Sequence, residues 1–258
     1  AVLNWDDQEV RKISEELSCR VITCGFGEGA VVRALNGGGQ GIADTAGGLS
    51  FSIQTPEETY QVTSRLMGEK NAYNILMSAG VAYAIGIDKE ALIEGIQRAR
   101  AIEGRFEAVE AGQNFHCIVD YAHTEDALRS LIQEARQITR GRIITVFGCG
   151  GDRDWKKRPK MGEGATDLSD FVVITSDNPR TEDPAGIIKG ITDGVKKTNF
   201  YVEPDRATAI QYAVSIAREG DTLLIAGKGH EDYQEIQGVR HPFSDKEVFK
   251  RAIKEIKG

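Results

Sequence analysis

Charged and polar side chains are concentrated in four short segments, each of which directly follows a run of apolar residues typical of a buried strand. The segments are Asp120–Thr124, Gly148–Pro159, Ser176–Arg180 and Gly227–Glu231. In an open parallel sheet, ligands bind just outside the carboxyl ends of the strands. Four such segments in succession therefore predict one polar pocket at a sheet edge, rather than four unrelated solvated turns.

The charges in these segments are of both signs, which narrows the class of ligand. Arg153 and Arg180 can each hold a carboxylate through two parallel hydrogen bonds. Asp177 and Glu231 are acceptors suited to an ammonium group, and Asn178 can donate or accept. Interleaved cations and anions match a zwitterion, and a compound with amino and carboxylate groups at both ends would use all of them. The alternative is that these side chains pair with one another as a network along the rim.

Length and composition exclude several classes of protein. The chain has 258 residues, and at roughly 150 residues per domain this indicates two domains or one large one. A net charge of −7 disfavours a nucleic-acid or anionic-membrane partner. No apolar run approaches the ~20 residues that cross a bilayer, and the first residues do not resemble a signal peptide. The four cysteines form no C-x-x-C pair, so we expect a cytoplasmic protein with free thiols.

The part of the chain after residue 103 alternates regularly between strands and helices. Its candidate strands are rich in β-branched residues without polar alternation, which is typical of a parallel sheet covered on both faces. They span residues 116–120, 142–147, 171–175 and 222–226. Apolar stripes predict helices over 126–138 and 205–217, the second with Asp205 as its N-cap. The pattern predicts a Rossmann-like, doubly wound, mostly parallel sheet.

The first part of the chain reads as the remainder of a second α/β unit. Helical spacing is seen in residues 7–17, 71–85 and 89–101, and residues 20–25 read as a short buried strand. Val2–Asn4 is typical of the end of a strand, and glycine-rich residues 26–53 predict small strands joined by turns. We place the boundary near Glu103-Gly104, giving an α/β protein with domains 1–103 and 104–258.

Several motifs together resemble one known family. Residues 104–234 contain, in order, GRFEAVEAG, IVDYAHTEDAL, VFGCGGDRDWKKRPKMG, TSDNPRTEDP, DRATAI and IAGKGHEDYQ. This run resembles the C-terminal domain of the Mur ligases, and within them the MurE subfamily. Upstream, Asn4–Asp7 is similar to the N-x-D-D element of the family, and Gly68–Asn74 to its N-x-x-N helix start. The resemblance covers essentially the whole chain. It implies the C-terminal part of the central ATP-binding domain, followed by the complete amino-acid-binding domain.

The resemblance implies an amino-acid site for meso-diaminopimelate. The four residues Asp177–Arg180 (DNPR) resemble the signature of Mur ligases that add this compound, and relatives that add lysine lack this form of the motif. Trp155 stands where many relatives carry lysine. Carried over by position, the site residues are Arg153, Asp177, Asn178, Pro179, Arg180, Gly227 and Glu231.

The resemblance also implies contacts with ATP from Asn71, Arg105 and Asp120. From the residues alone, Asn71 is equally well explained as a helix cap, and Arg105 as a partner in a surface ion pair. Lys228 and the basic cluster 156–158 are expected to be solvated charges, or to add positive field for phosphates. No residue is assigned as a catalytic acid, base or metal ligand.

What is missing from the chain limits the implied activity. No G-x-x-x-x-G-K-[ST] is present, so the nest that cradles ATP phosphates is not supplied here. In the family, this P-loop, the magnesium ligands and a carbamylated lysine all precede the position equivalent to Ala1, as does the domain that holds the UDP-sugar. The chain therefore resembles the back half of a ligase whose N-terminal half would be its partner, and we expect the chain alone to be inactive.

For the whole enzyme, the resemblance implies ATP- and Mg²⁺-dependent amide formation in peptidoglycan precursor synthesis. An acyl phosphate would form on the D-glutamate of UDP-N-acetylmuramoyl-L-alanyl-D-glutamate, and the amine of meso-diaminopimelate would attack it. Two alternatives are a non-catalytic binding module of the same fold and an L-lysine-adding MurE. A folate-polyglutamylating ligase shares the architecture but does not account for the DNPR motif.

Overall fold

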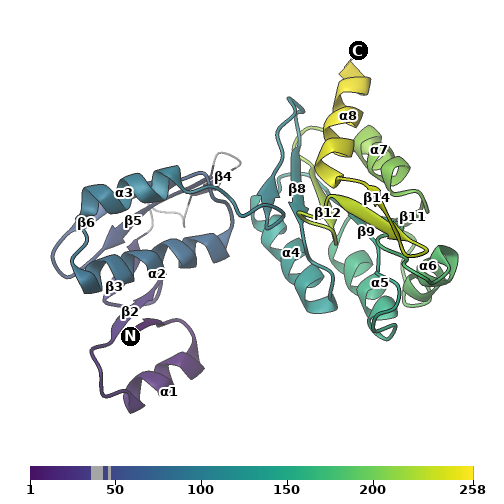
Figure 1. Ribbon diagram of the computed structural model, residues 1–258. Coiled ribbons are helices and arrows are strands. Elements are labelled where there is room, and N and C mark those ends of the chain that lie inside the picture. The colour runs from purple at the N-terminus through teal and green to yellow at the C-terminus, as the bar shows by residue number, and fades with distance from the viewer. Residues whose placement is uncertain (36–42, 46–47, 258) are drawn as a thin grey trace. The chain divides into compact units, whose positions relative to one another are not determined.

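The structure, a computed structural model, describes residues 1–35, 43–45 and 48–257. It divides into two compact units, residues 1–101 and 102–258, each built on its own sheet (Figure 1). The division lies two residues before the boundary that the sequence predicts. Within the described ranges, no helix is both long enough and apolar enough to cross a membrane.

The first unit is a six-stranded sheet with two long helices packed on it. Its strands are β1 (Val2–Asn4), β2 (Ile22–Gly25), β3 (Val32–Leu35), β4 (Ala43–Thr45), β5 (Gly48–Gln54) and β6 (Thr59–Ser64). The first three are parallel, whereas β5 pairs antiparallel with β3, β4 and β6. Helix α2 (Glu69–Ile85) packs on β1, β2 and β3, and α3 (Lys89–Arg98) packs on β6. Residues 36–42 and 46–47 of the predicted strand-and-turn region lie outside the described residues.

The N-terminal motif is fixed by hydrogen bonds to Asp6. Its carboxylate accepts from the backbone N–H groups of Phe26 (2.6 Å) and Gly27 (2.9 Å) and from the hydroxyl of Tyr73 (2.8 Å). Burial opposes ionisation of Asp6, but these hydrogen bonds and the charge of Arg11 outweigh it and lower the pKa of the carboxyl group. The two upstream motifs of the family resemblance are thus in direct contact. The neighbouring Asp7 caps α1 (Gln8–Glu16).

The second unit is a six-stranded sheet in the order β11-β10-β9-β12-β8-β7. The first five are parallel and β7 is antiparallel. The strands are β7 (Glu107–Ala108), β8 (His116–Asp120), β9 (Ile143–Phe147), β10 (Phe171–Ile174), β11 (Phe200–Val202) and β12 (Thr222–Ala226). In register, Ala226 lies opposite Asp120, and Ile174 lies opposite Phe147. The segments that follow β8, β9, β10 and β12 therefore leave the sheet from the same edge, as predicted.

Helices cover both faces of this sheet (Figure 1). Helices α4 (Glu125–Ile138), α5 (Lys157–Leu168) and α6 (Pro184–Thr192) pack side by side on one face, and α7 (Arg206–Ile216) and α8 (Asp245–Lys257) pack on the other. The predicted helices over 126–138 and 205–217 are confirmed, and Asp205 caps α7 by accepting from the N–H of Thr208 (2.8 Å). Helices α5, α6 and α8 and the hairpin of β13 (Tyr233–Ile236) and β14 (Val239–Pro242) were not predicted.

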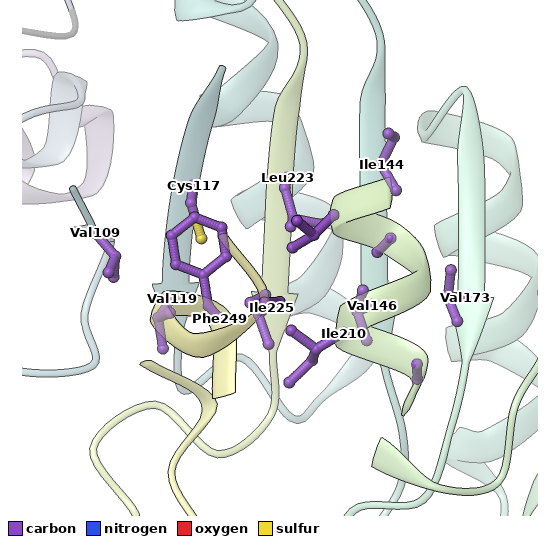
Figure 2. Packing of buried hydrophobic residues seen from close by; sticks show 14 of the residues in the cluster. Val109, Cys117, Val119, Ile144, Val146, Val173, Ile210, Leu223, Ile225 and Phe249 are labelled. Atoms are coloured by element: carbon purple, nitrogen blue, oxygen red, sulfur yellow. The ribbon is translucent and has the colours of Figure 1, made fainter. Parts of the chain in front are cut away.

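The core on the α7–α8 side explains the uninterrupted apolar strands. Ile144 and Val146 of β9 and Ile225 of β12 point toward Ile210 of α7, and Phe249 of α8 covers the β8 side (Figure 2). Alternate residues of the same strands face the helices on the opposite side, so almost every position is buried. This double coverage is the physical reason why the strands show no polar alternation.

At the opposite end of the sheet, Asp221 holds the starts of two strands together. This buried carboxylate accepts from the backbone N–H of Arg142 (2.8 Å), from the Arg142 guanidinium (2.7 Å) and from the N–H of Arg218 (3.0 Å). Burial opposes ionisation, but the hydrogen bonds from Arg142 and Arg218 outweigh it and lower the pKa of Asp221.

Replacing Asp221 with asparagine should destabilise the protein in a pH-dependent way. The loss in unfolding free energy at neutral pH should be about 1–3 kcal/mol, since a charge-assisted acceptor becomes a neutral amide. Because the pKa of Asp221 is lowered in the folded state, its contribution is present above the unfolded value of about 3.9 and disappears as the pH falls through the folded value. Urea unfolding of wild type and D221N at pH 7 and at about pH 2 measures this. A difference that stays constant between the two pH values would contradict it.

Candidate functional site

The loops that follow β9 and β10 are joined to each other. The N–H of Gly151 donates to the carbonyl oxygen of Asn178 (2.9 Å), and the hydroxyl of Thr181 donates to the carboxylate of Asp152 (2.8 Å). Asp152 and Arg180 both have positive φ, 53° and 51°, a conformation that is uncommon for residues with a side chain. The two loops therefore hold each other in one strained arrangement, of the kind that accumulates at binding sites.

The β13–β14 hairpin is the third element of the site. The N–H of Arg180 donates to the carbonyl oxygen of Glu235 (3.0 Å), and the Gln234 amide donates to the carbonyl oxygen of Asp177 (2.7 Å). The N–H of Glu235 also donates to the side-chain oxygen of Asn178 (2.9 Å). Sequence reasoning missed this hairpin, although Gln237-Gly238 forms its turn with two positive φ angles and is a recognisable turn signal.

The two predicted arginines reach the same point of the loop after β9. A Cβ atom added at Gly150 would lie 2.9 Å from Nη1 of Arg180 and 3.9 Å from Cγ of Arg153. Arg180 also donates from Nη1 to the carbonyl oxygen of Gly151 (2.7 Å), and its Nε lies 3.8 Å from the carboxylate of Glu235. Arg153 is exposed. Both side chains of the predicted carboxylate-binding pole therefore pass Gly150, Arg180 with its guanidinium and Arg153 with its Cγ, while Nη1 of Arg153 donates to the carbonyl oxygen of Asp152 (3.1 Å).

The predicted ammonium-binding pole is organised around Lys228. Its ammonium donates to the side-chain oxygen of Asn178 (2.9 Å) and to Oε2 of Glu231 (3.0 Å), and it lies 3.8 Å from Oδ1 of Asp177. The Asn178 amide donates to the same Oε2 of Glu231 (2.8 Å). Lys228 is fully buried, so the prediction that it is a solvated charge is wrong, whereas its contribution of positive field for phosphates stays a prediction. The sequence also allowed the alternative that these side chains pair with one another. For Asn178 and Glu231 this is correct, because they are hydrogen-bonded to each other.

The basic cluster 156–158 is also only partly solvated. Arg158 is buried and its Nη2 contacts both carboxylate oxygens of Glu182, at 2.8 and 2.9 Å, whereas Lys156 and Trp155 are exposed. Arg158 therefore anchors the loop after β10 rather than presenting a charge to solvent.

A second buried charge pair, Arg206 and Asp245, lies next to the site at the starts of α7 and α8. The Arg206 guanidinium makes two hydrogen bonds of 2.8 Å to the carboxylate of Asp245, which joins α7 to the start of α8. Burial raises the pKa of Asp177, although the charges of Arg206 and Lys228 oppose this shift. Gly227 has φ of 117°, and a Cβ there would lie 2.7 Å from Oδ2 of Asp177. Only glycine fits at that position.

Two of the predicted nucleotide contacts lie at the start of the second unit. The carboxylate of Asp120 accepts from the N–H groups of Phe106 and Ala122, both at 2.7 Å. One carboxylate oxygen thus holds the backbone at Phe106, and the other holds the backbone at Ala122. The guanidinium carbon of Arg105 lies 4.9 Å from the centre of the Tyr121 ring, which His123 also contacts. Asp120 therefore holds the loop on which Arg105 is presented. The contact of Arg105 in the structure is therefore a cation–π contact with Tyr121, rather than the surface ion pair that was the alternative.

The third predicted nucleotide contact, Asn71, lies in the first unit. Its amide donates to the carbonyl oxygen of Met67 (2.7 Å) and its oxygen accepts from Asn74 (3.3 Å). The residue at the N-cap of α2 is Gly68, so the interpretation of Asn71 as the cap is wrong. Throughout residues 1–35, 43–45 and 48–257, no group of three or more His, Cys, Asp or Glu side chains is placed to hold a metal ion.

Two protein families match the sequence over most of the chain. The family described as "Mur ligase, glutamate ligase domain" matches residues 104–229, and "Mur ligase middle domain" matches residues 1–82. The chain belongs to the Mur ligase family. The resemblance of the motifs is thereby confirmed.

Individual Mur ligases match the chain along its whole length. A UDP-N-acetylmuramoyl-L-alanyl-D-glutamate–2,6-diaminopimelate ligase of Bacillus licheniformis is 44% identical over 257 residues, which are 100% of this chain and 52% of that protein. The ligase of the same name from Alkaliphilus metalliredigens is 45% identical over 259 residues, covering 98% of this chain and 51% of that protein. The chain spans about half the length of these curated relatives.

Solved structures support the fold. A structure of a UDP-N-acetylmuramoyl-L-alanyl-D-glutamate–2,6-diaminopimelate ligase superposes with a TM-score of 0.75 and 32% identity, covering 100% of this chain and 53% of that one. The MurF ligase of Thermotoga maritima, in complex with ADP, superposes with a TM-score of 0.65 and 16% identity over 99% of this chain and 54% of that one, which shows a shared fold. The predicted α/β class with a mostly parallel sheet is confirmed.

Gly151 provides a test of how tightly the two loops are joined. A Cβ there would lie 2.0 Å from the carbonyl oxygen of Pro179, so G151A must separate the loops and should lower the unfolding free energy by about 1–3 kcal/mol. The matched control is G186A in α6, where the added Cβ meets one atom at 3.8 Å. In denaturant unfolding, the control should change stability by less than about 1 kcal/mol. Equal effects of the two substitutions would count against the joined-loop arrangement.

Proposed function

We propose that this chain is the amino-acid-binding half of an ATP-dependent ligase that joins meso-diaminopimelate to UDP-N-acetylmuramoyl-L-alanyl-D-glutamate in peptidoglycan precursor synthesis. The observation that carries this proposal is that two arginines (Arg153 and Arg180) and two carboxylates (Asp177 and Glu231) lie on the loops that follow β9, β10 and β12, at one edge of the sheet. The names of relatives 44–45% identical to the chain support the reaction. Because the chain spans half their length, the complete reaction belongs to a longer protein.

On this proposal, the site binds one of the two amino-carboxylate ends of meso-diaminopimelate, and the amine of the other end is the one that reacts. Arg153 and Arg180 hold the carboxylate, and Glu231 and Asp177 attract the ammonium. Buried Pro179 and Asn178 fix the turn that presents Arg180, and Gly227 gives Asp177 the room it needs. The side chain of L-lysine ends in an ammonium without a carboxylate and would leave both guanidinium groups without this partner, so we expect it to bind more weakly.

The free amine of the bound amino acid would attack an acyl phosphate formed on the D-glutamate side chain, releasing phosphate. Asn71, Arg105 and Asp120 are our candidates for the ATP-facing residues, with Arg105 supplying positive charge and Asp120 fixing its loop. ATP and Mg²⁺ supply phosphoryl transfer and charge neutralisation when bound. Holding the amine in place and excluding water both matter, because an acyl phosphate hydrolyses readily.

We also assign this activity to the cytoplasm. Cys24, Cys117 and Cys149 are buried as free thiols, which is usual in a reducing compartment. Burial raises the pKa of Cys149 to about 12 and that of Cys24 to about 11, so neither is a reactive thiolate at neutral pH.

Binding of the amino acid tests the proposal directly. In titration calorimetry, the 258-residue chain should bind meso-diaminopimelate in preference to L-lysine. R180A should weaken meso-diaminopimelate binding by roughly 30- to 1000-fold, because a charge-assisted pair is lost. The control is R251A, an exposed arginine of α8, which should leave binding unchanged. Equal affinity for the two amino acids, or an unchanged affinity in R180A, would remove the substrate assignment.

An assay of turnover tests whether this chain can catalyse the reaction without the N-terminal half of the proposed ligase. Because this sequence has no G-x-x-x-x-G-K-[ST], the chain by itself should bind the amino acid and release no phosphate from ATP above the uncatalysed background. A coupled phosphate assay with UDP-N-acetylmuramoyl-L-alanyl-D-glutamate and meso-diaminopimelate present measures this. Multiple turnovers by the chain would show that the phosphate-binding machinery lies within it, contrary to the proposal.

A further inference from the structure

Lys228 places a positive charge inside the pole that we assign to the ligand's ammonium group. Its side chain is fully buried, and its ammonium contacts Asn178, Glu231 and Asp177 at 2.9, 3.0 and 3.8 Å. The ring of Tyr233 lies 5.5 Å away on the hairpin. An ammonium is kept in such a place only when surrounding charges and acceptors compensate for its loss of hydration.

The charges around Lys228 leave one negative charge uncompensated. Asp177 and Glu231 contribute two negative charges and Lys228 one positive charge, while Arg206 is matched by its own partner Asp245. Both hydrogen bonds that the described residues give to the Glu231 carboxylate end on Oε2. The Glu231 side chain keeps 16% of its surface exposed, so an ammonium from outside can reach this residue.

This residual charge has consequences for a ligand whose ammonium and carboxylate share one carbon. Two uncompensated carboxylates at the acidic pole would attract any cation strongly, and they would repel the ligand carboxylate, which shares a carbon with the bound ammonium and has to reach Arg153 and Arg180. With Lys228 in place, the attraction for one ammonium remains and the repulsion of its neighbouring carboxylate is reduced.

We infer that Lys228 is a positioning and specificity residue, which orients Asn178 and Glu231 and sets the charge of the acidic pole so that it selects an amino-acid end over a bare ammonium. This inference rests on the proposed function and adds to it a residue that acts through others. In terms of ligand chemistry, Lys228 favours meso-diaminopimelate, whose side chain ends in an amino-carboxylate, over L-lysine, whose side chain ends in an ammonium alone.

The test is the ratio of two affinities in K228M, measured by calorimetry on the 258-residue chain with meso-diaminopimelate and, by competition, with L-lysine. The substitution removes the positive charge that compensates Asp177 and Glu231 and makes the acidic pole more negative above the pKa of Asp177, so the affinity ratio of meso-diaminopimelate to L-lysine should fall by about tenfold or more. The control K196M removes an exposed lysine and should leave the ratio unchanged. If Lys228 had a merely structural role, K228M would weaken both ligands by the same factor, and that result overturns the inference.

A second variant keeps the inference testable if K228M does not fold. E231Q alters a partly exposed side chain, retains Lys228 and leaves the pole neutral, so the affinity ratio should rise, opposite to the change in K228M. A ratio that is unchanged or falls in E231Q contradicts the inference. A wild-type chain that does not bind meso-diaminopimelate removes the proposed function and the inference together. If the wild-type chain binds meso-diaminopimelate selectively but the affinity ratio is unchanged in both variants, the inference about Lys228 is wrong and the proposed function stands.

Discussion

The site depends on one buried cation that holds together residues from different strand ends. Lys228 follows β12, and it contacts Asp177 and Asn178, which follow β10, together with Glu231 of its own loop. Asn178 in turn accepts from the hairpin at Glu235. A charge with no access to water must be compensated by its neighbours, so these side chains have little freedom to move independently. The acidic pole is thus preorganised before any ligand arrives.

The sheet supplies the other constraint. Parallel strands in register bring their carboxyl ends to one edge, and the loops after β9 and β10 then approach so closely that Gly148 and Gly151 leave no room for a side chain. The strained backbone at Asp152 and Arg180 is maintained by these contacts and by the hairpin. The arginine pole is therefore positioned by the contacts between the two loops. The acidic pole, formed by Asp177 and Glu231, is positioned by the buried Lys228. Together they are the two poles to which our proposal assigns the binding of a zwitterion.

Much of this architecture could be predicted from the sequence, because it follows from local patterns. Strands buried on both faces show uninterrupted β-branched residues, and β8 and β12 begin and end where that pattern predicts. The residues that we propose for both poles can be selected from the sequence because opposite charges recur after successive strands, and their binding role stays a prediction. Helix α5 was missed because Pro159 and two glycines interrupt its sequence, and these residues are tolerated there only by packing against neighbouring helices. In α8, the spacing of Val248, Phe249, Ala252 and Ile253 is helical, so this helix can be predicted from the sequence.

The burial of Lys228 could not be predicted in the same way. A lysine between two glycines in a loop is normally solvated, and its surroundings depend on residues about fifty positions away in the sequence. The most direct test of the account is a crystal structure of this chain with meso-diaminopimelate. The account predicts one carboxylate of the ligand between the guanidinium groups of Arg153 and Arg180, and the adjacent ammonium on Glu231, with Lys228 still buried beneath it. A ligand bound elsewhere, or bound here with its ammonium toward the arginines, would contradict it.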